Sequence, residues 1–189
     1  MRAIELNLTH SDIPQLIVGL GNIGKDYVNS RHNAGFLFVD AVLEALELKG
    51  YTCNFSDEKL YELWSFPKLK LNLLKPKTLM NLSGRAVREY YRYHKPYNSS
   101  ALFVVHDDLD IALGDFKISA GKGPRLHNGL SSLEQELSTS GFIRVRLGIE
   151  NRNGLPISGL DYVLYKFTTE ELITIKTTIA GILKDRCVI

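Results

Sequence analysis

The chain has 189 residues, of which 44% are hydrophobic and 23% charged, and its formal net charge is +2. This length and composition fit one soluble globular domain with a sizeable core, and the chain shows no repeat, low-complexity tract or obvious linker. Its two cysteines lie far apart and no apolar run approaches the ~18 residues of a membrane span, which argues against a disulfide scaffold, a zinc site and a membrane protein and favours a cytoplasmic one.

The first half of the chain alternates strand and helix patterns. The apolar segment 16–18 predicts a short buried strand that ends in a glycine turn at 19–24. Apolar residues at helical spacing predict a helix over about 33–49. Between 51 and 74, apolar and polar residues alternate, which indicates strands in a hairpin that turns near Pro67.

The second half repeats this alternation. Ser83 is placed to cap a helix that Pro96 ends. The segments 102–105 and 116–118 have the apolar, β-branched and aromatic character of strands. Asn128 is placed to cap a further helix with an inward-facing leucine stripe.

The end of the chain completes the pattern. Gly141 lies past the helix that Asn128 opens, and the segment 142–149 alternates as a strand. A capping-box pattern at 168–171 opens the final helix. We therefore predict an α/β fold, a single domain over 1–189 with a twisted mixed β-sheet flanked by helices on both faces. Residues 1–14 are expected to be an N-terminal extension, too polar for a signal peptide.

The glycine turn has the spacing G-x-G-x-x-G, which holds a pyrophosphate in dinucleotide-binding folds when a helix begins at the third glycine. Here no apolar periodicity follows Gly24 until Phe36. Asp40, the candidate for the acid that binds the ribose, falls inside the predicted helix. A nicotinamide-dependent oxidoreductase and a plain turn are alternatives, and we favour a loop that carries Asn22 into a site.

A histidine and two acids lie where an α/β sheet assembles ligand sites. His32 is in a polar loop before a helix, and its reference pKa of about 6.5 suits a general base. Its alternative role is a bond to backbone at the helix start, with Asn33 as the cap. Asp107 and Asp108 follow the apolar run 102–105, where an aspartate can orient a histidine ring or, alternatively, cap backbone N–H groups.

The same run offers a metal site as a further alternative, built from His106, Asp107, Asp108 and Asp110. Adjacent residues on a strand point to opposite faces, so these side chains do not easily converge on one ion. We therefore expect no metal.

Two asparagines, Asn81 and Asn128, lie near predicted helix starts. Capping is the default role for an asparagine in that position. Its amide can also donate to a carbonyl or to a developing oxyanion. Neither role follows from one asparagine alone.

Charge is unevenly distributed along the chain. From Phe66 to Pro96 there are eight lysines or arginines and one acid, Glu89, a net charge of +7. Such segregation suggests an anionic partner, with nucleic acid as the leading candidate. A solvated helix face beside a lysine-rich edge hairpin is an equally open interpretation.

Several multi-residue motifs occur in a fixed order: GLGNIG at 19–24, then Tyr27, RHNAG at 31–35, KPKTLMNLSG at 75–84, HDDLD at 106–110, HNGL at 127–130, RVRLGI at 144–149 and YVLYKF at 162–167. From about Leu16 to the C-terminus, the chain thereby resembles the bacterial peptidyl-tRNA hydrolase family. The family's patterns are GLGNPG, RHNxG, KPxTxMNxSG, HDDLD, HNGL and RxRxGI. Together they are far more specific than the glycine turn alone.

The resemblance implies an esterase that cleaves the bond between tRNA and a peptide or N-blocked aminoacyl group, recycling tRNA from prematurely released peptidyl-tRNA. It implies His32 as the base that activates water and Asp107 as the acid that orients it. It implies that the peptide, the tRNA 3′ end and the acceptor arm are contacted by Asn22, Tyr27, Met80, Asn81 and Asn128. It implies Arg146 as a contact to the tRNA 5′ phosphate. No cofactor or metal is implied.

The chain departs from the family pattern at Ile23, Ser119, 123–126 and 150–152. Ser119 stands where many members have a lysine for the 5′ phosphate, and Lys117 or Lys122 can substitute. The segment 123–126 replaces a glycine-rich mobile lid, and Pro124 and Leu126 should stiffen it. These departures affect phosphate recognition and lid motion rather than the chemistry.

A binding protein without catalysis is the competing reading, because the same fold resembles a chloroplast splicing factor that works with RNA and partner proteins. A member repurposed in this way should lose site residues or gain an apolar docking patch. Here His32, Asp107, Asn22, Asn81 and Asn128 are all present, which favours the enzyme. We expect a monomer, since no coiled-coil or domain-swap signal is found.

Overall fold

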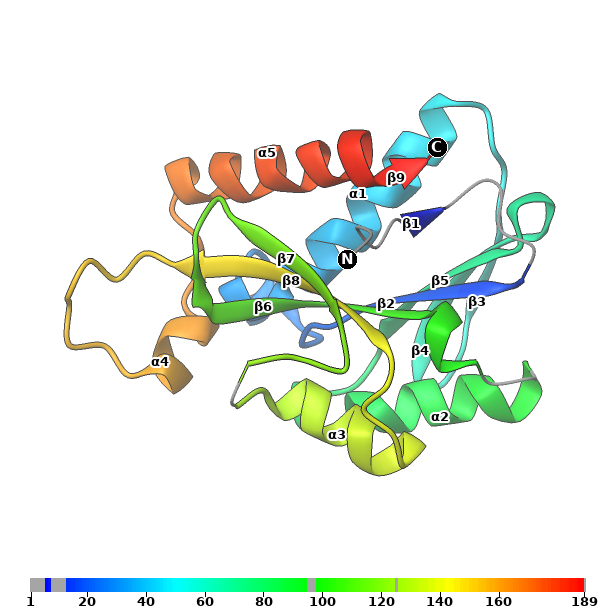
Figure 1. Cartoon of the computed structure of the whole chain (residues 1–189), viewed down its shortest axis with the longest axis horizontal. Coiled ribbons are helices and arrows are strands. Elements are labelled where there is room, and N and C mark those ends of the chain that lie inside the picture. Colours follow the sequence, from blue (N-terminus) through cyan, green and yellow to red (C-terminus); the bar gives the residue numbers. More distant parts are fainter. Residues whose placement is uncertain (1–5, 8–12, 95–97, 125, 189) are drawn as a thin grey trace.

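The computed structural model describes residues 6–7, 13–94, 98–124 and 126–188. Within these residues, seven strands form one mixed sheet at the centre of the molecule (Figure 1). From edge to edge they are β3 (Asn54–Asp57), β4 (Tyr61–Phe66), β5 (Leu71–Pro76), β2 (Gln15–Gly19), β6 (Leu102–Ala112), β8 (Ile143–Glu150) and β7 (Phe116–Ala120). The central strand β2 is parallel to β5 and β6, and β6 is parallel to β8, whereas β4 and β7 are antiparallel to their neighbours.

Helices cover both faces of this sheet (Figure 1). One face carries α1 (Ala34–Leu48) and α5 (Thr169–Arg186), and the other carries α2 (Ser83–Tyr93) and α3 (Asn128–Leu137). A separate hydrophobic core lies under each pair. The predicted α/β fold, one domain with a mixed sheet flanked on both faces, is confirmed. The short helix α4 (Gly159–Leu164) and the parallel pair β1 (Leu6–Asn7) and β9 (Cys187–Val188) were not predicted.

Most predicted elements occur where the sequence pattern is local and strong. The helix expected over about 33–49 is α1, and the hairpin that turns at Pro67 joins β4 to β5. The capping box before α5 is confirmed: Thr168 N donates to Glu171 Oε2 at 2.9 Å, and Glu171 N donates to Thr168 Oγ1 at 3.2 Å. On α5, Ile175, Ile179 and Ile182 lie on one face and are buried.

Two predicted helix caps are wrong. α2 begins at Ser83 itself, Leu82 is at the N-cap position, and the buried Ser83 hydroxyl has no hydrogen-bond partner among the described residues. α3 begins at Asn128, and the cap is the residue before it, His127. Each helix starts one residue earlier than expected, because a favourable cap residue does not by itself fix the first turn. The predicted stop at Pro96 lies outside the described residues.

β6 is longer than the strand predicted at 102–105 and continues to Ala112. Its neighbour β2 ends at Gly19, but β8 stays paired with β6 as far as Asp108 before the register shifts. The polar run is therefore part of the strand rather than a loop after it. Asp107 still lies beyond the carboxyl end of β2, at the edge where open α/β sheets form ligand sites.

The glycine turn after β2 serves packing and chain direction. A Cβ on Gly19 would lie 2.3 Å from the carbonyl oxygen of Gly35, so glycine lets α1 lie directly on the strand. Gly24 has a φ of 111°, which favours glycine. The third glycine is followed only by a three-residue 3₁₀ turn, Lys25–Tyr27, and α1 begins at Ala34, so no α-helix N-terminus lies there to hold a pyrophosphate. The fold does not support the nicotinamide alternative.

Candidate active site

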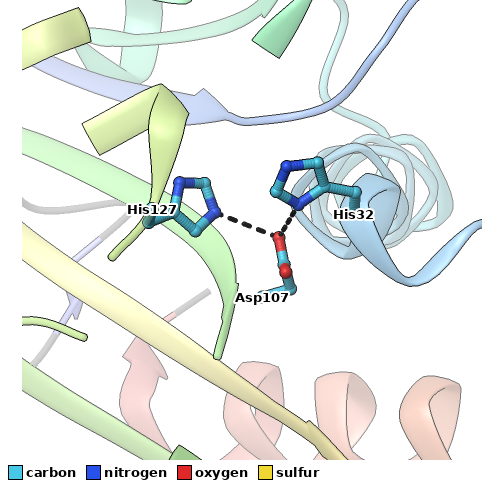
Figure 2. A group of neighbouring side chains, drawn as sticks. All are labelled: His32, Asp107 and His127. Atoms are coloured by element: carbon cyan, nitrogen blue, oxygen red, sulfur yellow. Dashed lines mark hydrogen bonds and ion pairs between the residues drawn. The ribbon is translucent and has the colours of Figure 1, made fainter. Parts of the chain in front are cut away.

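Three side chains from separate elements meet beyond the end of β2 (Figure 2). His32 comes from the turn before α1, Asp107 from β6 and His127 from the start of α3. Both rings bind the same carboxylate oxygen, because Asp107 Oδ1 lies 2.9 Å from His32 Nδ1 and 3.1 Å from His127 Nε2. All three residues are buried. The alternative in which His32 binds only backbone is wrong.

His127 is the site residue that sequence reasoning missed. Its Nδ1 accepts hydrogen bonds from the backbone N–H groups of Gly129 at 3.2 Å and Leu130 at 3.3 Å, and so caps α3. A nitrogen that accepts carries no proton, so the proton lies on Nε2 and is donated to Asp107. Both ring nitrogens of His127 are therefore committed. Two signals pointed to it, namely its place in the HNGL motif and its position directly before the helix, but the more usual cap residue Asn128 drew the assignment.

His32 differs from His127 in having one ring nitrogen to spare. Its Nδ1 binds Asp107, and no hydrogen-bond partner of its Nε2 occurs among the described residues. Burial lowers the pKa of His32, but the charge and hydrogen bond of Asp107 outweigh it, so the pKa lies above its ordinary value. With Nδ1–H donated to the carboxylate, the Nε2 lone pair is the one available to accept a proton.

The electrostatics around the carboxylate favour its ionised form. Burial alone raises the pKa of Asp107, but the neighbouring His32 and His127 rings and their hydrogen bonds hold it below its usual value. His106, on the same strand, donates from Nδ1 to the Asp107 carbonyl oxygen at 2.7 Å and packs edge-on against the His127 ring. Burial lowers the pKa of His106 to about 3, so its ring stays neutral.

Asn22 is held in place by two other residues. The Asn33 side chain accepts from Asn22 N at 2.8 Å and donates to Asn22 O at 3.0 Å, so Asn33 clamps the glycine turn and does not cap α1 as the alternative required. The Asn22 side chain accepts the Met80 N–H at Oδ1, at 2.7 Å. That bond identifies Oδ1 as the acceptor and leaves Nδ2 as the donor.

A cavity of about 540 Å³ opens beside this cluster. Seven predicted site residues line it: Asn22, Tyr27, His32, Met80, Asn81, Asp107 and Asn128. His127 lines it too, and residues of α4 form part of its wall. Seven of the eight predicted site residues, from distant parts of the sequence, thus converge on one cavity.

Arg146 is the exception. It lies on β8 opposite His106, and its Nε donates to Asp108 Oδ2 at 2.6 Å. It is not among the described residues that line the cavity. Asp108 also accepts the Asp110 N–H at 2.9 Å, so the capping role weighed for these acids holds for Asp108 and not for Asp107.

The cluster of His32, Asp107 and His127 has the composition of a metal site, since one ligand atom from each lies within 4.8 Å of the others. The hydrogen bonds argue against ligation by these atoms. His127 Nε2 carries a proton and would have to exchange it for a metal, which would move the proton to Nδ1 and break the cap of α3. The donor set fits a hydrogen-bonded cluster better than a metal centre.

The basic stretch 66–96 is not an isolated positive patch. Five of its cations form ion pairs with acids: Lys75 with Asp40, Lys77 with Asp57, Arg85 and Arg88 with Glu136, and Arg92 with Glu89. The pattern matches the solvated-surface interpretation. Exposed ion pairs are weak, however, and their arginines can exchange a carboxylate for a phosphate.

A buried histidine–aspartate pair at the edge of a parallel sheet, facing a cavity, is typical of a hydrolytic enzyme of the α/β class. The peptidyl-tRNA hydrolase family model matches residues 16–186. The chain therefore belongs to the peptidyl-tRNA hydrolase family, and it is a hydrolase.

Individual relatives support this assignment. The chain is 46% identical over 170 residues to a peptidyl-tRNA hydrolase of Geotalea uraniireducens (strain Rf4), covering 89% of this chain and 85% of that one. It is 43% identical over 171 residues to the Geobacter sulfurreducens protein of the same name, with the same coverage of 89% and 85%. The crystal structure of peptidyl-tRNA hydrolase from Acinetobacter baumannii matches with a TM-score of 0.78 and 29% identity, over 93% of this chain and 88% of that one. In the part of the chain described here, no helix is both long and apolar enough to cross a membrane.

Proposed function

We propose that this protein hydrolyses the ester between a peptide and the 3′ end of tRNA, acting in the cytoplasm as a monomer without metal or cofactor. Family membership supports the substrate. The observation that carries the mechanism is the division of roles between two histidines on one carboxylate. His127 has both ring nitrogens occupied, and His32 has one nitrogen free beside the cavity.

The chemistry follows from that arrangement. His32 Nε2 accepts a proton from a water molecule as the water oxygen attacks the ester carbonyl carbon. Asp107 stabilises the imidazolium that forms and keeps Nδ1–H in place. The tetrahedral intermediate then collapses, the ribose oxygen leaves, and His32 returns the proton to it. A general base of this kind contributes a factor of about 10²–10⁴.

The asparagines supply donors for the oxyanion and the substrate. Asn22 is the best defined, because its Oδ1 is occupied by the Met80 N–H and its Nδ2 is left to donate. Asn81 and Asn128 are exposed at the cavity and can bind the peptide backbone or the tRNA 3′ end. Tyr27 and Met80 complete the contact surface. One oxyanion donor contributes a factor of about 10²–10³.

We expect the tRNA 5′ phosphate to bind outside the cavity. Arg146 donates its Nε–H to Asp108 Oδ2, which leaves the N–H groups of Nη1 and Nη2 to bind the phosphate. Lys117 is exposed on β7 and pairs in register with Arg146, so a phosphate above this pair of strands would meet both cations. We therefore assign the 5′ phosphate to Arg146 together with Lys117, which takes the place of the lysine that many family members have at position 119.

Release of the acyl group from an N-acetyl-aminoacyl-tRNA by EDTA-treated protein tests this function. We expect robust hydrolysis by the wild type and a loss of about 10²–10⁴ in His32→Ala. His94→Ala is the matched control, because His94 is exposed at the end of α2 and should leave the rate unchanged. A normal rate in His32→Ala would remove His32 as the base. A wild type that binds tRNA without hydrolysis would indicate an RNA-binding protein instead.

A further inference from the structure

The mouth of the cavity is lined by exposed leucines. Leu79, Leu126, Leu160 and Leu164 all line the cavity, and their exposed fractions lie between 44% and 92%. They come from three separate segments, namely the end of the 77–79 loop, the residues before α3, and α4. A contiguous patch of exposed apolar side chains often marks a binding site. We call these four residues the apolar rim.

The rim contrasts with the cavity floor. The floor carries Asn22, His32 and Asp107, which are buried and hydrogen-bonded. Among the described lining residues, none is a lysine or an arginine. The rim thus offers no cation to a phosphate and suits an uncharged, apolar part of a substrate. Leu126 is the most exposed of the four.

We propose that the apolar rim binds the side chains of the acyl group and gives this enzyme a preference for peptidyl-tRNAs with apolar residues next to the ester. This inference rests on the proposed function. The ester carbonyl must lie at the floor, within reach of water activated by His32. The acyl residue therefore leads outward past Leu79, Leu126 and Leu160, where an apolar side chain buries surface that is otherwise exposed to water.

The size of the preference follows from the openness of the rim. A methylene group in a closed apolar pocket changes kcat/KM by about 10- to 200-fold. The rim leucines are exposed to solvent rather than enclosed, so a whole leucine side chain should gain only about tenfold over a polar side chain of the same shape. Removing one leucine of the rim should reduce that ratio by about threefold.

Two substrates on the same tRNA body test the proposal: N-acetyl-leucyl-tRNA and N-acetyl-asparaginyl-tRNA, whose side chains have nearly the same shape but differ in polarity. We expect the kcat/KM ratio of leucyl to asparaginyl substrate to fall in Leu126→Gly and in Leu160→Ser. Leu155→Ser is the matched control, because Leu155 is 61% exposed and does not line the cavity. Comparing ratios between variants cancels the intrinsic reactivities of the two esters.

The outcomes separate this inference from the function it rests on. If every variant hydrolyses both substrates with the wild-type ratio, the rim does not select the acyl group and the inference is wrong, while the hydrolase stands. If sedimentation shows a wild-type dimer that Leu126→Gly abolishes at an unchanged ratio, the rim is a surface for a second copy. No hydrolysis of either substrate by the wild type would overturn both proposals.

Discussion

The floor of the cavity and the basic stretch 66–96 are both rich in polar groups, but they hold them differently. On the floor, one buried carboxylate oxygen receives two hydrogen bonds, and Nδ1 of His127 receives two more. In the basic stretch, exposed arginines pair with glutamates of α2 and α3. Water screens exposed charges far more than buried ones. Changes on the floor should therefore alter activity by orders of magnitude, and changes in the stretch by small factors.

Asp107→Asn is the change with the largest expected effect. Both rings face the same oxygen of Asp107, so an asparagine places either its oxygen or its amide between them. With the oxygen there, both hydrogen bonds survive, but the negative charge that stabilises the His32 imidazolium is lost. With the amide there, the proton of His32 is forced onto Nε2, which then has no lone pair for water. The corresponding change in a serine protease triad lowers kcat by about 10⁴, and we expect a similar loss here in single-turnover hydrolysis. A loss below about tenfold, in a variant with wild-type thermal stability, would show that Asp107 does not set the tautomer.

The pH profile sharpens the same prediction. A base must be unprotonated to act, so kcat/KM should fall as the pH drops through the pKa of His32. Asp107 raises that pKa above its ordinary value of 6.5. In Asp107→Asn the residual activity should therefore have its acidic limb at lower pH than in the wild type. An acidic limb at the same pH in both proteins would assign it to another group.

Asn22→Asp tests the oxyanion donor and should have the next largest effect. The aspartate keeps an oxygen for the Met80 N–H but loses the amide N–H that faces the cavity. We expect kcat to fall by about 10²–10³. Asn98→Asp is the matched control, since Asn98 is exposed and its Oδ1 likewise accepts a backbone N–H, from Ser100. Equal activity of the two variants would mean that Asn22 only joins the two loops.

Local sequence patterns predicted the elements well because their physics is local. The box between Thr168 and Glu171 needs only residues three apart, and it forms as expected. The cap at Asn128 failed for a reason outside the local pattern. His127 is the cap because its other nitrogen is held by Asp107, which lies on a strand extended by pairing with β8.

The candidate site was predictable as a set of residues but not as a geometry. Motif matching selected His32, Asp107 and Asn22, and the structure brings them to one cavity. The motifs do not reveal that His127 shares the carboxylate of Asp107, or that the Asn33 side chain clamps the Asn22 backbone. These contacts depend on strand register and on the packing of α3, which no short segment of sequence contains.

The charge count of the basic stretch was incomplete for a related reason. Counting residues from 66 to 96 gives a charge of +7, but three of the acids that pair with its cations lie elsewhere in the sequence, at Asp40, Asp57 and Glu136. A charge count along the chain omits partners that only the fold supplies.

Replacing Arg85, Arg88 and Arg92 with glutamine should have the smallest effect of these changes. All three are exposed on α2, and in the described part of the chain they pair with two glutamates, Glu89 and Glu136, so a positive charge remains for phosphates. If tRNA binds there, KM at low salt should rise by about three- to tenfold with kcat unchanged, and KM should depend less steeply on salt. The double change Lys176→Gln and Lys184→Gln on α5 is the control for charge alone. An equal response of both proteins would make the stretch an ordinary solvated surface. The cavity floor would then be the functional region of the two, and the stretch would have no role in tRNA binding.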